Sequence, residues 1–139
     1  MQTVYIILLV VVGIFGLGVL VYSHFCKEYL KAFYKIQDEY VTPIEEKEKE
    51  IKLLDKEIKS CENVIEILKS YNSEDKTIKL VLINNIFQRD VLVTNKKFIL
   101  EEIKFLEKEM CDNAPMFFLS EYIEKKVNWK EFFQWYFKK

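Results

Sequence analysis

The segment from Val4 to Tyr22 has the sequence VYIILLVVVGIFGLGVLVY, and it decides the fold of this chain. It contains 19 residues and no charge, whereas a helix needs about 20 apolar residues to cross the hydrocarbon core of a bilayer. In lipid every backbone N–H must find its partner within the segment, which a helix provides. Tyr5 and Tyr22 stand near its two ends, where aromatic rings prefer the interface. Residues 1–26 are therefore predicted to form a single transmembrane anchor.

The distribution of charge supports this prediction. The chain has 139 residues and a net charge of -1, but all 21 basic and all 22 acidic residues follow Cys26. A cleaved signal peptide fits less well, because the segment has no basic residue before it, exceeds the usual apolar length and lacks an A-x-A site. A buried helix of a soluble core is also a poor fit, since a chain of this size cannot cover an entirely apolar helix.

The flanks of the anchor predict its orientation. Lys27, Lys31 and Lys35 follow it, whereas the other side offers only the α-amino group. The positive-inside rule then places the C-terminal part in the cytoplasm, or in the matrix of a mitochondrion. Three glycines within the anchor could pack against another membrane helix, or could reflect the ordinary glycine content of such helices: Gly13, Gly16 and Gly18. No two of them have the G-x-x-x-G spacing.

Residues 27–41 are predicted to continue the helix as a juxtamembrane stalk, because no Pro or Gly occurs between Gly18 and Pro43. The stalk carries an apolar stripe at helical spacing that requires cover: Phe25, Tyr29, Phe33, Ile36 and Tyr40. A rod from about Thr3 to Val41 is expected. Residues 42–139 would form one small, mainly helical domain.

A new helix is expected at Thr42-Pro43-Ile44-Glu45, where an N-cap, a proline at the first helical position and a capping box coincide. It would end near Tyr71-Asn72-Ser73. Its apolar residues follow a heptad pattern: Ile44, Ile51, Leu54, Ile58, Ile65 and Leu68. Isoleucine at a with leucine at d favours a parallel two-stranded coiled coil.

A second helix is predicted from about Thr94 to Cys111, with Ile99, Ile103, Leu106 and Met110 at matching spacing. The two helices could form an antiparallel hairpin within the chain, or each could pair with another chain. Residues 77–93 are ambiguous between a β-hairpin turning at Asn84-Asn85 and a helix. Their β-branched content favours the β-hairpin.

The C-terminal tail is predicted to form two helices. The first, at about Pro115–Val127, would present one apolar face composed of Met116, Leu119, Tyr122, Ile123 and Val127. The second would follow a capping box at Asn128–Glu131, and is amphipathic. Its aromatic face, opposite lysines, comprises Trp129, Phe132, Phe133, Tyr136 and Phe137. That face could dock on the protein's own core, on an anionic membrane surface or in the groove of a partner.

No constellation typical of catalysis is found. Cys26, Cys61 and Cys111 have no C-x-x-C spacing, and His24 is the only histidine, so no metal site is expected. No glycine loop for phosphate occurs outside the anchor, and the near-neutral charge argues against nucleic acid as a partner. We expect no cofactor and no enzymatic activity.

These features favour a membrane-anchored structural or assembly subunit, whose helical, coiled-coil-like domain binds other subunits of a membrane complex or a second copy. The plan of a short N-terminal anchor before such a domain is similar to that of the inner-membrane subunits of phage spanins. Two alternatives stay open. One is a small membrane-active effector of the lysis or toxin type, and the other is a membrane-tethered sensor domain.

Overall fold

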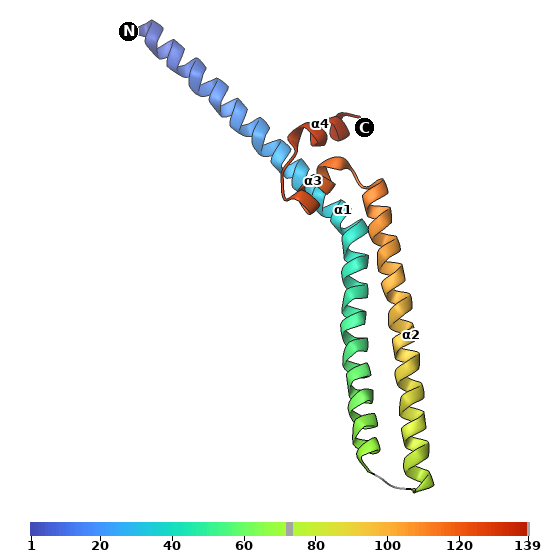
Figure 1. The fold of residues 1–139 in the computed structure, drawn as a ribbon. Coiled ribbons are helices and arrows are strands. Elements are labelled where there is room, and N and C mark those ends of the chain that lie inside the picture. The colour runs from blue at the N-terminus through green and yellow to red at the C-terminus, as the bar shows by residue number, and fades with distance from the viewer. Residues whose placement is uncertain (72–73, 139) are drawn as a thin grey trace. The chain divides into compact units, whose positions relative to one another are not determined.

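The computed structural model describes residues 1–71 and 74–138, which form four helices and no strand (Figure 1). These are α1 (Gln2–Ser70), α2 (Lys76–Asn113), α3 (Met116–Glu124) and α4 (Trp129–Phe137). The prediction of a mainly α protein with a long apolar N-terminal helix is confirmed. The chain divides into two compact units. The terminal unit comprises Met1–Asp38 and Pro115–Lys139, and the hairpin unit comprises Glu39–Ala114.

Helix α1 does not break at Pro43, so the predicted helix start at Thr42 is wrong. A proline within a helix lacks the N–H that would bond to the fourth preceding carbonyl, here that of Glu39. The cost is about 3 kcal/mol. The neighbouring side chains of Val41 and Ile44 are both buried, and this burial stabilises the helix across the proline. The helix ends at Ser70, and Asn72 and Ser73 lie outside the described residues.

Helix α2 includes residues 77–93, so the predicted β-hairpin is wrong. Asp75 caps the helix by accepting a hydrogen bond from the Thr77 N–H at 2.9 Å. Asn85, predicted in the turn of the β-hairpin, and Thr94, predicted at the start of a helix, bond back to the carbonyls of Val81 and Asp90 at 2.8 and 2.9 Å. The apolar residues at helical spacing decide the conformation here, because tertiary packing outweighs the modest strand preference of β-branched residues.

The hairpin unit pairs the second part of α1 with α2 in antiparallel directions (Figure 1). Two ion pairs set the register: Lys47 with Glu102, and Lys96 with Asp55 at 2.6 Å. Between the helices lies an apolar seam whose residues are buried or half-buried: Ile44, Ile51, Leu54, Ile58, Ile65, Leu68, Ile99, Ile103 and Leu106. Most of these are only half-buried, because two helices alone cannot enclose a seam.

In the terminal unit, α3 and α4 pack on the part of α1 that follows the apolar segment. Helix α3 ends at Glu124 because Lys125 adopts a left-handed conformation with φ of 59°. The N–H of Lys126 then bonds to the Ser120 carbonyl at 3.3 Å, which closes the helix end. Helix α4 begins as predicted, since the Asn128 side chain accepts a hydrogen bond from the Glu131 N–H at 3.2 Å.

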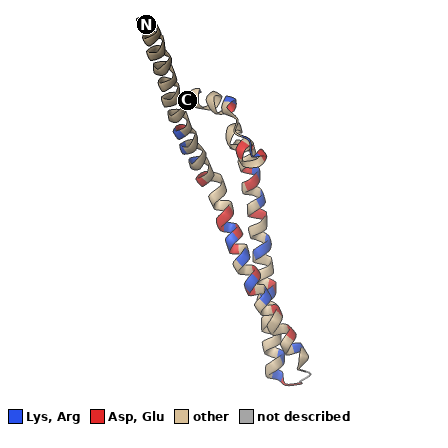
Figure 2. Cartoon of the chain, turned by 90° about the vertical axis from the view of Figure 1, so that its left-hand side faces the viewer, with Lys and Arg blue, Asp and Glu red and all other residues tan. Residues whose placement is uncertain are grey.

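The first turns of α1 carry no charge and are covered by nothing in the described chain (Figure 2). Among the described residues, this is the one stretch of helix that is long and apolar enough to cross a membrane, and it lies near the N-terminus.

Candidate interaction surfaces

Tyr29 on α1 lies at the centre of an aromatic cluster that holds the terminal unit together. Its side chain is 4% exposed, and its ring centroid lies 5.1 Å from Trp129, 5.1 Å from Phe132 and 5.4 Å from Phe117. These tilted and edge-on contacts are the arrangements that aromatic quadrupoles favour. Three residues of the apolar stripe on the stalk, Phe25, Tyr29 and Phe33, are thus covered by rings of α3 and α4.

Polar contact within the cluster comes from the Tyr29 hydroxyl, which donates a hydrogen bond to the Glu121 carboxylate on α3. Burial raises the pKa of Tyr29 above its ordinary value, and the bond to Glu121 raises it further. The neutral phenol is therefore the form that the folded unit keeps. This hydrogen bond fixes the position of α3 relative to the Tyr29 ring. Ring contacts alone have no such preferred position, because they are not directional enough to stop α3 from shifting along α1.

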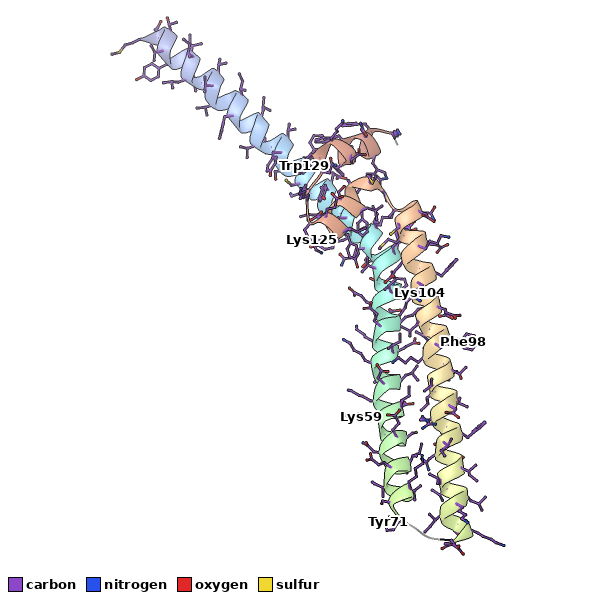
Figure 3. The ribbon with its side chains drawn as sticks, viewed as in Figure 1. Lys59, Tyr71, Phe98, Lys104, Lys125 and Trp129 are labelled. Atoms are coloured by element: carbon purple, nitrogen blue, oxygen red, sulfur yellow. The ribbon has the colours of Figure 1, made fainter. Side chains whose placement is uncertain are left out.

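Closer to the apolar segment, Phe25 contacts three rings of α4. Its centroid lies 5.0 Å from Phe133, 5.9 Å from Tyr136 and 6.2 Å from Phe137. Tyr22, the last residue of the apolar segment, lies 6.2 Å from Trp129. Helix α4 thus begins beside the end of the uncovered segment. Its first residue, Trp129, is labelled in Figure 3.

Of the three placements left open for the aromatic tail, the structure has the tail docked on the chain itself. Phe132 is fully buried, Trp129, Phe133 and Tyr136 are half-buried, and Phe137 is exposed. The predicted final helix ends at Phe137, and Lys139 lies outside the described residues. The aromatic face is used internally, while Lys130 and Lys138 stay exposed.

The apolar face predicted for α3 is not the one that packs against the rest of the terminal unit. Phe117 and Phe118 are the residues that are fully buried, whereas Met116, Ile123 and Val127 are exposed. Phe117 lies 5.0 Å from Trp135, and Phe118 lies 4.9 Å from Phe33. Helix α3 has only 9 residues, so periodicity gives little information there. The larger area of two adjacent phenylalanines was the signal available in the sequence.

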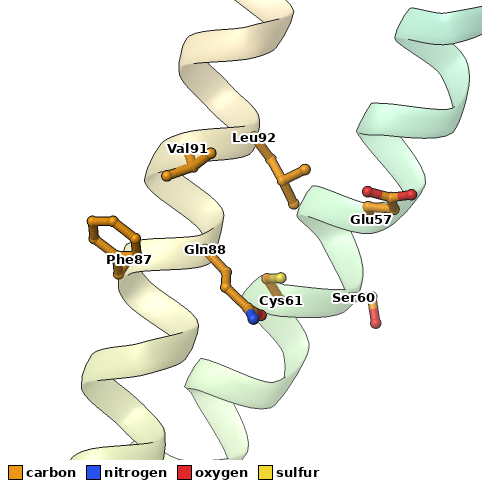
Figure 4. A pocket seen from close by; sticks show the side chains of 7 residues that line it. All are labelled: Glu57, Ser60, Cys61, Phe87, Gln88, Val91 and Leu92. Atoms are coloured by element: carbon orange, nitrogen blue, oxygen red, sulfur yellow. The ribbon is translucent and has the colours of Figure 1, made fainter.

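Shallow grooves flank both units. A cavity of about 400 Å³ beside the apolar segment is lined by Gly18, Val21, Tyr22, Phe25, Trp129 and Phe133. In the hairpin unit, a groove of about 490 Å³ lies between Cys61 on α1 and Gln88 on α2, which point toward one another (Figure 4). Its lining is mostly apolar, and no group of polar side chains converges in it as a small-molecule site requires.

The predicted helix-packing glycines are not in contact with other parts of the protein. A Cβ added at Gly13, Gly16 or Gly18 would meet no atom within 4 Å. The structure therefore leaves the surface around these residues open to lipid or to another helix.

Chemistry-bearing side chains do not gather anywhere in the described ranges. Among residues 1–71 and 74–138, no three His, Cys, Asp or Glu side chains are placed to hold a metal ion. Cys26, Cys61 and Cys111 are free thiols, and Cys111 is exposed. Comparison with protein family models, curated proteins and solved structures found no match to this chain.

Proposed function

We propose that this protein is a membrane-anchored structural or assembly subunit. The first part of α1 crosses the bilayer, and the hairpin unit binds another protein of a membrane complex. The observation that carries the proposal is the contrast along α1. Its N-terminal apolar turns have no cover, whereas the same helix becomes the scaffold of a packed aromatic cluster directly after Tyr22.

The geometry of the terminal unit supports the anchor. Tyr22 and Trp129 lie together where the apolar segment ends, and both residue types favour the membrane–water interface. The lysines Lys27, Lys31 and Lys35 follow at once. The cluster would then sit at the membrane surface and hold the first turns of the stalk rigid.

A binding role for the hairpin unit is supported by its surface. Large apolar side chains remain exposed along it, including Leu53, Ile67, Phe87 and Phe98. Contiguous exposed apolar surface of this kind marks protein or membrane contacts. The absence of clustered catalytic side chains in the described residues leaves binding as the role that the chain's residues support.

Orientation in the membrane is part of the proposal. The positive-inside rule places the hairpin unit in the cytoplasm or the matrix. Cys111 is exposed and outside the apolar segment, so it reports on sidedness. A membrane-impermeant maleimide should label Cys111 only after the cells are permeabilised. Labelling of Cys111 in intact cells, absent from a Cys111→Ser control, would reverse the orientation.

The test of the function itself is purification of the full chain in a mild detergent, with an affinity tag at the C-terminus, followed by mass spectrometry. We expect a stoichiometric partner or a defined oligomer. A monomer that captures nothing and crosslinks to nothing in the membrane would refute the subunit role.

A second candidate, the membrane-active effector, loses its main support because the aromatic face of α4 is occupied by α1. Induced expression that dissipates the membrane potential would restore that candidate and overturn the first.

A further inference from the structure

A second apolar face runs along α2, separate from the seam that contacts α1. It consists of six large apolar side chains that are all exposed: Leu80, Ile83, Phe87, Val91, Phe98 and Phe105. At 3.6 residues per turn these six fall within about 80° of one another, so they form one straight stripe. We call it the outer stripe.

Much of the outer stripe is open to solvent, although Phe87 and Val91 also line the groove beside Cys61 of α1. Phe87 and Phe98 are 67% and 62% exposed, although phenylalanine is usually a core residue. Figure 4 shows Phe87 on the side of α2 opposite to the one from which Leu92 reaches toward α1. Figure 3 shows Phe98 projecting from α2 away from α1 in the same way. Helix α2 therefore has one apolar face for its own chain and another that its own chain leaves largely uncovered.

The outer stripe follows a heptad pattern. Val91, Phe98 and Phe105 recur every seven residues, and Leu80 and Phe87 form the companion row. Two rows of this kind create the seam of a two-stranded coiled coil. Asn84 falls in the first row, and a single Asn at this position favours a parallel, in-register pair.

Charges flank the outer stripe unequally. On one side lie Lys97 and Lys104, and on the other lie Glu102 and Glu109. In a parallel pair of α2 helices, each flank faces the opposite flank of the mate. Lys97 then lies opposite Glu102 of the second copy, which also pairs with Lys47 of its own chain, and Lys104 lies opposite Glu109 of the second copy. An antiparallel pair centred on the stripe would instead place Lys104 opposite Ile83 and Glu102 opposite Val81.

We infer that the outer stripe binds a second copy of this chain in a parallel, in-register homodimer. This inference rests on the proposed function and names its partner. A two-fold axis along the membrane normal keeps both anchors in the same orientation, and a parallel pair of helices is compatible with such an axis.

Three charged layers oppose the pairing. Lys108 falls in the companion row and Asp112 in the first row, so each would face the same residue of the second copy. Glu101 falls in the companion row and would face Glu101 of the second copy. Like charges at such a position destabilise a dimer, so Glu101→Leu should tighten the association.

Disulfide trapping tests the geometry in the full chain, reconstituted in bilayers after Cys26→Ser, Cys61→Ala and Cys111→Ser. Val91→Cys in this background should form a linked dimer on mild oxidation. Leu100→Cys is the matched control, because Leu100 is also an exposed apolar residue of α2 but lies on another face. Equal linking at Leu100→Cys, or none at Val91→Cys, would overturn the inference.

Charge reversal tests the register. Lys104→Glu or Glu109→Lys alone should raise the dimer dissociation constant about tenfold, because an attractive pair becomes repulsive on both sides of the two-fold axis. The double variant should restore the original value. Additive weakening in the double variant would exclude the parallel register.

Phe98→Glu should give a monomer in mild detergent, with Val64→Glu on α1 as the control that stays dimeric. Circular dichroism of each variant separates loss of pairing from loss of folding. A wild-type monomer that still captures a different protein in stoichiometric amount would refute the homodimer and leave the proposed function intact. If the wild type is a monomer that binds anionic vesicles, and Phe98→Glu abolishes this binding, the homodimer is refuted and the outer stripe faces lipid.

Discussion

The terminal unit and the hairpin unit both use α1, but they stabilise it differently. In the terminal unit two short helices cover a short stretch of α1 and bury Phe117, Phe118 and Phe132 completely. In the hairpin unit a single long helix runs beside α1, and most seam residues stay half-buried. Enclosure therefore depends on the number of elements around α1 rather than on the length of the contact.

This difference bears on where the proposed partner would bind. The terminal unit places large rings on several sides of Tyr29, so its apolar stripe is satisfied within the chain. Among its described residues the hairpin unit has no third helix, and ion pairs such as Lys47–Glu102 join its two helices. Exposed ion pairs contribute little to stability, about 0–1 kcal/mol each. The hairpin unit is thus the part that gains most from association.

The largest loss of stability is expected from Phe132→Ala, which should remove the enclosure that distinguishes the terminal unit from the hairpin unit. Phe132 is fully buried among the rings of the terminal unit, and removing such a side chain costs about 3–5 kcal/mol. Trypsin should then cleave rapidly at Lys125 or Lys126 in the full chain in detergent, because the tail is released from α1. Phe137→Ala is the control, since Phe137 is 69% exposed and should leave the cleavage rate unchanged. Equal cleavage of both variants would mean that the cluster does not hold the tail.

A smaller loss is expected from Ile103→Ala in the hairpin unit. Ile103 is among the few fully enclosed seam residues, and its truncation should cost about 2–4 kcal/mol. Hydrogen exchange measured by mass spectrometry should show faster exchange across α2, with α3 and α4 unaffected. Leu100→Ala is the matched control on an exposed face. Faster exchange in α3 and α4 as well would show that the two units unfold together.

The long elements could be predicted from the sequence because their patterns are long. The apolar run from Val4 to Tyr22 and the heptads beginning at Ile44 each extend over several helical turns. Ile99 and Ile103 at seam spacing likewise placed the C-terminal part of α2 correctly.

The errors came from local signals that tertiary packing overrode. Thr42-Pro43 has every feature of a helix start, yet burial of Val41 and Ile44 carries α1 through it. The β-branched residues before Val93 suggested a strand, but half-buried side chains such as Leu82 and Leu92 repeat at helical spacing. The Tyr29–Glu121 bond joins residues far apart in the chain, so no local pattern could reveal it.

Tyr29→Phe sharpens the comparison, because it removes the polar contact of the terminal unit and keeps the ring. Loss of a hydrogen bond to a carboxylate should lower the free energy of unfolding by about 1–2 kcal/mol. The folded state raises the pKa of Tyr29, so the phenol holds its proton more tightly in the folded protein than in the unfolded chain. This contribution is complete below pH 10 and is lost as the pH rises further, because only the unfolded chain then releases the proton.

The measurement is thermal unfolding of the wild type and Tyr29→Phe in detergent between pH 7 and about pH 11. The difference between the two proteins should be constant up to about pH 10 and should shrink above it. A difference in unfolding temperature that grows with pH would contradict a raised pKa. Tyr34→Phe, at an exposed tyrosine, is the control, and its pH profile measures the effect of losing a hydroxyl that is not buried.

The smallest effect is expected at the end of α3, where Lys125 has a φ of 59°. A left-handed conformation costs a residue with a side chain about 1 kcal/mol, and glycine avoids this cost. Lys125 also lies over the Tyr122 ring, 5.5 Å from its centroid, and an exposed contact of this type contributes about 0.5 kcal/mol. Lys125→Gly should therefore stabilise the terminal unit by about 0.5 kcal/mol, whereas Lys125→Ala should slightly destabilise it. Because both variants lack the amine, the difference between them isolates the backbone strain. If the two variants unfold at the same temperature, the end of α3 is not held in the left-handed conformation, and the C-terminal tail is less firmly ordered than the aromatic cluster implies.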